Sequence, residues 1–202
     1  MALLEPLRKH EETYMKIEKK MRETIKSHNN GIPLSDYNIK KISRVVNKDL
    51  KRRHDNVKKL ILTEMNAKEA ELMELYHGSP NAMQIIKDGF SAQYSDNSNM
   101  FGVGIYFANF SSKSNQFAWG NMQGCPPHRD RSCSKCVRHL LVCSCFMGNI
   151  YRPTAPTRQV PKGFHSVAAE PGVVPSLCYP EFAVLNGDQA LPLYLIEYTI
   201  VP

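Results

Sequence analysis

Apolar residues near the start of the chain recur at helical spacing. They follow one another at intervals of three, four and four residues, and charged residues occupy most positions between them. The four residues are Tyr14, Ile17, Met21 and Ile25. A stripe of this kind lets a helix bury one face. The pattern therefore predicts a helix over residues 11–27, ended by the turn signal Asn29-Asn30-Gly31.

Further along, short apolar runs and alternation predict mainly strands. The expected strands are 37–47, 72–76, 105–108, 140–146, 181–185 and 193–201, and the expected helices are 48–70 and 81–87. Loops are expected at 91–99 and 152–174, where Ser and Asn or Pro and Gly gather. Asn186-Gly187 is a hairpin signal between the last two strands.

The length and composition of the chain favour a single domain. A chain of 202 residues with 42% apolar content can form a hydrophobic core. No apolar run reaches the ~18 residues of a membrane span, and the N-terminus lacks the apolar segment of a signal peptide. We therefore expect a reducing compartment, cytoplasmic or nuclear, where cysteines are more often metal ligands than disulfides. The net charge of +7 predicts a solvated basic surface, and it would also suit a small anionic substrate such as a pyrophosphate.

Four of the seven cysteine and histidine residues between positions 121 and 150 have metal-ligand spacing. Cys125, His128, Cys133 and Cys136 form the pattern C-x2-H-x4-C-x2-C. Two close pairs of soft ligands can complete a tetrahedron around zinc, and a complete Cys3His set leaves no open position, so the role would be structural. A redox C-x-x-C or a pair of disulfides would be the alternatives. Cys143 and Cys145 are expected to be plain core thiols.

The stretch from Phe101 to Phe117 has the composition of a binding site for a flat, uncharged ring. Two glycines precede a β-like run, and a hydroxyl-rich turn at residues 111–114 follows it. Glycine lets backbone approach a ligand closely. An ordinary strand and turn would have the same pattern. His77-Gly78 places an imidazole beside approachable backbone, although a lone histidine is more often structural.

Glu181 opens a short apolar strand, Glu181-Phe-Ala-Val-Leu185. A carboxylate among apolar neighbours is costly unless it is paired or faces a cleft. The alternative is a glutamate at a strand edge that faces water.

These motifs together resemble the catalytic domain of poly(ADP-ribose) polymerases. The resemblance is carried by His77-Gly-Ser79, by Met100-Phe-Gly-Val-Gly-Ile-Tyr-Phe-Ala108 and by Ser111-Ser-Lys-Ser-Asn-Gln116. Within that family the chain is most similar to the tankyrases. This similarity also implies zinc at the Cys3His positions. It implies an α+β ADP-ribosyltransferase fold over residues 1–202, in which antiparallel β-sheets form an NAD cleft with flanking helices and a small zinc-binding loop. Residues 1–75 would be a helix-strand-helix part and residues 76–202 the NAD-binding and catalytic part.

The resemblance also implies roles for individual residues. The catalytic residues would be His77, Tyr106 and Glu181, and the further NAD-binding residues would be Gly78, Ser79, Tyr94, Ser114 and Phe117. Glu181 would bond the nicotinamide ribose and activate an acceptor hydroxyl, while Tyr106 and Phe117 would enclose the nicotinamide. The family usually has tyrosine at the position of Phe117, and tankyrases carry histidine at that of Tyr94.

The function implied is transfer of ADP-ribose from NAD, a consumed substrate, to protein acceptors and to the chain itself, with elongation into a polymer. Activity is expected without nucleic acid, because the regulatory helical domain of DNA-dependent relatives has no counterpart here. One alternative is a mono-ADP-ribosyltransferase. Another is a non-catalytic zinc-containing module that binds protein or RNA.

Overall fold

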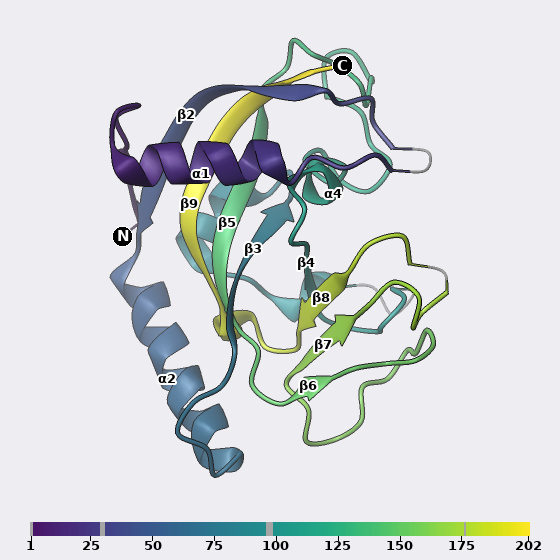
Figure 1. Ribbon diagram of the computed structural model, residues 1–202. Coiled ribbons are helices and arrows are strands. Elements are labelled where there is room, and N and C mark those ends of the chain that lie inside the picture. Colours follow the sequence, from purple (N-terminus) through teal and green to yellow (C-terminus); the bar gives the residue numbers. More distant parts are fainter. Residues whose placement is uncertain (1, 29–30, 96–98, 176) are drawn as a thin grey trace.

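Two β-sheets form the framework of the computed structural model, which describes residues 2–28, 31–95, 99–175 and 177–202 (Figure 1). The larger sheet has the order β1-β2-β9-β5-β3, and all its neighbours are antiparallel. Its strands are β1 (Leu3–Pro6), β2 (Asp36–Val46), β3 (Leu72–Gly78), β5 (Arg138–Phe146) and β9 (Ala190–Val201). The smaller sheet has the order β4-β8-β7-β6, with β6 and β7 parallel. Its strands are β4 (Ile105–Phe107), β6 (Ile150–Tyr151), β7 (Ser166–Ala169) and β8 (Glu181–Val184).

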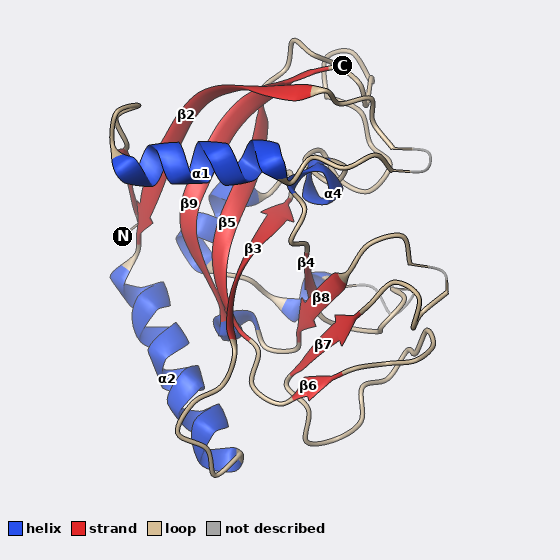
Figure 2. Ribbon diagram, viewed as in Figure 1, coloured by secondary structure: helices blue, strands red, loops and turns tan. Residues whose placement is uncertain are grey.

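Helices flank the larger sheet (Figure 2). They are α1 (Glu12–Glu23), α2 (Lys48–Glu64), α3 (Ala82–Asp88) and the short α4 (Ser111–Asn115), with 3-10 turns η1 (Ala92–Tyr94) and η2 (Gly187–Gln189). The apolar stripe predicted for α1 is buried through Tyr14, Ile17 and Met21, which pack on one face of the sheet. Among the described residues, no helix is both long and apolar enough to cross a bilayer.

Strand β5 is buried on both faces, because α1 covers one side and the smaller sheet, together with α3, covers the other. Leu140 and Val142 join the cluster beneath α1. Leu141, Cys143 and Cys145 point the opposite way, into a cluster shared with strands β4 and β8. Both cysteines are fully buried free thiols, as predicted from their alternation.

The two sheets meet where β3 leaves the larger sheet. Tyr76 and Ala108 exchange both backbone hydrogen bonds, at 2.8 and 3.0 Å. This bridge places the end of β3 beside β4 and α4, so residues some thirty positions apart in the sequence become neighbours.

Several local predictions are wrong. Residues 111–115 form helix α4 instead of a turn, and the predicted loop 152–174 contains strand β7. Asn186-Gly187 makes no hairpin, because β8 and β9 belong to different sheets. Asn186 instead caps η2, with Gln189 bonding back to its backbone N–H. Helix α2 ends at Glu64, earlier than predicted, and strand β1 was not predicted.

Candidate active site and metal centre

His77 and Tyr106 are joined at the bridge between the sheets. The Nδ1 atom of His77 lies 2.8 Å from the carbonyl oxygen of Tyr106. Burial lowers the pKa of His77, and the bond to Tyr106 opposes that shift only partly. Because a carbonyl only accepts, Nδ1 carries the hydrogen of the neutral ring, and Nε2 is left as an acceptor. The Phe90 and Phe107 rings pack against the imidazole at 5.1 and 5.3 Å between centroids.

The hydroxyl of Tyr106 is held by the loop before its own strand. It donates to the carbonyl of Gly102 at 2.9 Å and accepts from the N–H of Phe101 at 3.1 Å. Burial raises the pKa of Tyr106 to about 12, the N–H of Phe101 lowers it, and the nearby Glu181 carboxylate raises it again. Because the hydroxyl is already hydrogen-bonded within the protein, the ring of Tyr106 is the part of the side chain that can contact a ligand.

Glu181 is paired with a lysine that the sequence did not single out. Its Oε1 lies 2.8 Å from Nζ of Lys113, and the two side chains are 16% and 26% exposed. Glu181 opens β8, directly beside β4, while Lys113 lies in α4. The partly buried carboxylate is therefore neither unpaired nor in bulk water. A lysine in a serine-rich run was the one available signal for this partner.

Gly78 is required by the close approach of α4. A Cβ atom at this position would lie 1.9 Å from the carbonyl oxygen of Ser114. The Ser114 hydroxyl donates to the carbonyl of Tyr76 at 3.0 Å and is buried. Its oxygen keeps acceptor capacity, and the backbone of Gly78 lies beside it.

The other predicted NAD-binding residues occupy different positions around this site. Phe117 follows α4 and is 37% exposed, so its ring is available. The Ser79 hydroxyl accepts from the N–H of Asn81 at 3.1 Å, near the start of α3. Tyr94 belongs to η1, and its side chain lies outside the described part of the chain.

A second group of polar residues surrounds α4. Nε2 of His28 lies 2.8 Å from the Ser112 hydroxyl, and its ring meets Tyr179 edge-on at 4.6 Å. Tyr179 donates a hydrogen bond to the carbonyl of Ser27. Burial and then the charge of Lys113 lower the pKa of His28 to about 4. The segment after α1 is thus tied both to α4 and to the residues just before Glu181.

The four predicted metal ligands lie together in the loop between α4 and β5. Their ligand atoms are all within 4.8 Å of one another, and Nδ1 of His128 lies 3.4, 3.5 and 3.4 Å from the three sulfur atoms. The sulfur atoms belong to Cys125, Cys133 and Cys136. Zn–S bonds of about 2.3 Å and a Zn–N bond of about 2.0 Å at a tetrahedral angle would separate sulfur and nitrogen by about 3.5 Å. The donor set therefore fits zinc.

Arg138 connects this loop to the core. It is 1% exposed, and its guanidinium lies 3.8 Å above the ring of Trp119. Nη2 donates to the carbonyls of Arg131 and Cys133, at 2.7 and 3.4 Å. Three thiolates and one neutral imidazole around a divalent zinc would leave a net negative charge, which a buried guanidinium offsets. The sequence predicted neither Arg138 nor Trp119 as part of the site.

The comparison with known proteins identifies the family. Residues 11–200 match the poly(ADP-ribose) polymerase catalytic domain. The match includes the paired His77 and Tyr106, the Lys113–Glu181 pair and the Cys3His cluster. The chain therefore belongs to the family of poly(ADP-ribose) polymerase catalytic domains.

Proposed function

We propose that this chain transfers ADP-ribose from NAD to protein side chains and to itself, and elongates it into a polymer. Membership of the family makes NAD the substrate of an ADP-ribosyl transfer. The finer proposal, tankyrase-like elongation, depends on how Glu181 is presented. The observation that carries it is the Lys113–Glu181 ion pair, in which Glu181 opens the strand that pairs with the strand of Tyr106.

The glycosidic bond between the nicotinamide and its ribose breaks during the transfer, so positive charge develops on the glycosidic carbon. A carboxylate held near that carbon stabilises the charge. Lys113 holds the Glu181 side chain by one oxygen and leaves the other to bond the nicotinamide ribose. When an acceptor hydroxyl approaches, the same carboxylate can take its proton as a general base. Elongation needs this step, because a ribose hydroxyl is the acceptor of each added unit.

The remaining residues would bind and orient NAD. Nε2 of His77, an acceptor in the neutral ring, can take a hydrogen bond from a hydroxyl of the adenosine ribose. The backbone of Gly78 and the Ser114 hydroxyl would hold the carboxamide. The rings of Tyr106 and Phe117 would enclose the nicotinamide, and stacking needs only the ring, so phenylalanine suffices.

Zinc would have a structural role, since four protein ligands leave no position for substrate. Cys125, His128, Cys133 and Cys136 would hold it, and the metal would fix the loop that follows α4.

The test is incubation with labelled NAD and separation of the products by size. Wild-type protein should give a ladder of polymer. Glu181→Gln, which keeps the shape of the side chain, should remove the ladder and lower transfer by about 10²-fold or more, while circular dichroism shows that the protein is still folded. A single modified band from the wild type would instead support mono-ADP-ribosylation.

The non-catalytic alternative predicts no loss of NAD. Measuring free nicotinamide by chromatography distinguishes this alternative from the polymer-forming and the mono-ADP-ribosylating enzyme, both of which release nicotinamide. If nicotinamide is not released and Glu181→Gln changes nothing, the proposed function is wrong.

A further inference from the structure

A cavity of about 680 Å³ lies where strands β2 and β9 separate. Their pairing ends at Arg44 and Tyr194, whereas β9 stays paired with β5 as far as Ala190. A β-bulge leaves Leu193 without a partner in the β5–β9 pairing, and the preceding residue, Pro192, has no N–H to give to a neighbouring strand. Strand β9 therefore departs from β2, and α2 begins beside the opening.

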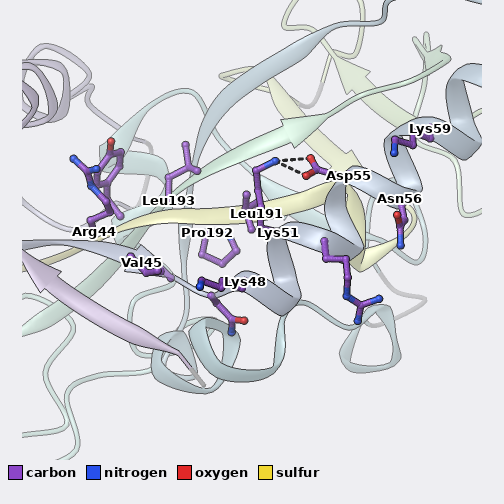
Figure 3. A pocket seen from close by; sticks show the side chains of 14 residues that line it. Arg44, Val45, Lys48, Lys51, Asp55, Asn56, Lys59, Leu191, Pro192 and Leu193 are labelled. Atoms are coloured by element: carbon purple, nitrogen blue, oxygen red, sulfur yellow. Dashed lines mark hydrogen bonds and ion pairs between the residues drawn. The ribbon is translucent and has the colours of Figure 1, made fainter.

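The opening, which we call the β2–β9 groove, has an aliphatic floor and a cationic rim. Its apolar residues are Val45, Val46, Leu191, Pro192, Leu193 and Tyr194. Its cations are Arg44, Lys48, Lys51, Arg52 and Lys59, against the single carboxylate of Asp55. Figure 3 shows Leu191 and Pro192 in the middle of the groove, with Arg44 at one end and Lys59 at the other.

Among the described residues, three of these cations have no anionic partner within ion-pair distance. Lys51 pairs with Asp55 at 2.5 Å, one turn along α2, and Arg52 pairs with Asp49 at the same distance. Arg44, Lys48 and Lys59 form no ion pair in the described part of the chain, and all three are exposed. A rim of uncompensated positive charge around apolar surface is complementary to an anionic ligand that also carries apolar groups.

We propose that the β2–β9 groove docks an acidic peptide segment that inserts an aliphatic side chain. The volume lies within the range of ordinary ligand sites, and it suits one or two anchoring side chains. Carboxylates on either side of the anchor would meet Arg44, Lys48 and Lys59. Single-stranded nucleic acid fits less well, because its bases stack on aromatic platforms and Tyr194 is the one aromatic residue lining the groove.

This proposal does not rest on the proposed function. None of the residues lining the groove belongs to the candidate active site or to the Cys3His cluster. Its failure would therefore leave the enzymatic proposal standing, and the reverse also holds.

The test is fluorescence anisotropy with a labelled peptide that carries a Leu-Val pair between runs of three glutamates. Two matched peptides replace the Leu-Val pair by Ser-Ser or the glutamates by lysines. The acidic Leu-Val peptide should bind at least about tenfold more tightly than either, since both the floor and the rim contribute.

Variants then locate the binding. The double variant Arg44→Glu/Lys48→Glu should weaken peptide binding about tenfold or more. The single variant Leu193→Ser should do the same. The matched control is Lys40→Glu with Lys68→Glu, which makes the same change of charge at exposed residues outside the groove. It should retain most of the affinity. Circular dichroism and melting temperatures check that every variant is folded.

Three outcomes would overturn the proposal. If the Ser-Ser peptide bound as tightly as the Leu-Val peptide, binding would be due to general charge attraction alone. If the Lys40/Lys68 control lost as much peptide affinity as the Arg44/Lys48 variant, the peptide would not bind specifically in the groove. Tighter binding of a poly-uridine oligonucleotide, lost in the Arg44/Lys48 variant, would assign the groove to nucleic acid instead.

Discussion

Lys113 and Glu181 form an ion pair of 2.8 Å between a helix and a strand that lie 68 residues apart in the sequence. The lysine belongs to α4 and the glutamate to the first position of β8. Each side chain is largely covered, so neither charge is fully screened by water. The pair therefore fixes the direction of the carboxylate on which the proposed chemistry depends.

Replacing Lys113 by methionine should impair transfer more than NAD binding. The carboxylate of Glu181 would lose its fixed partner, and a misplaced catalytic group costs up to about 10²-fold in rate. We expect kcat to fall about 10- to 100-fold with a smaller change in KM. Lys113→Arg should recover part of the rate, and Lys40→Met, at an exposed lysine outside the candidate site, should have no effect. A change confined to KM would contradict the positioning role.

Gly78→Ala should destabilise the protein and disturb the site together. The new Cβ would meet the carbonyl of Ser114 at 1.9 Å, so either β3 or α4 has to move. We expect the free energy of unfolding to fall by about 3 kcal/mol, measured in urea.

Gly163→Ala is the matched control for Gly78→Ala. Gly163 has φ of +88° but no atom within 4 Å of an added Cβ. That substitution should cost only the left-handed backbone, about 1 kcal/mol. Equal losses at the two positions would show that the approach of α4 to β3 is not tight.

Removal of zinc should be visible in the fluorescence of Trp119, the only tryptophan of the chain. Arg138 stacks on Trp119 and donates to carbonyls of the metal loop, so a loosened loop changes the surroundings of the indole. Cys133→Ala should release about one equivalent of zinc by elemental analysis. Cys178→Ala, outside the cluster, should retain it. Intact protein without bound metal would disprove the zinc assignment.

Stability should fall between pH 6.5 and about 4, in part because of His28. Burial lowers its native pKa to about 4, below the value near 6.5 expected in the unfolded chain. Between these values the unfolded state binds more protons, so the free energy of unfolding decreases as the pH falls. His28→Gln should make the dependence shallower in urea titrations from pH 7.5 to 4. An unchanged slope would show that His28 does not titrate differently on folding.

Much of this architecture could be read from local patterns. The stripe of α1 and the alternation of Cys143 and Cys145 depend on helix and strand periods, which act between near neighbours. The metal loop was predicted because its four ligands lie within twelve residues, so chain geometry alone brings them together. The η2 turn was misread as a hairpin, since Asn-Gly also suits a capped turn and only sheet membership separates the two.

The sequence by itself determined the residue types available for chemistry, the Cys3His spacing and the resemblance that assigned the family. Tertiary structure decided which groups meet. The bridge between Tyr76 and Ala108 joins His77 to Tyr106, α4 delivers Lys113 to Glu181, and Arg138 reaches Trp119. These contacts depend on how two sheets and a short helix pack, and packing is a property of distant segments that no local pattern encodes.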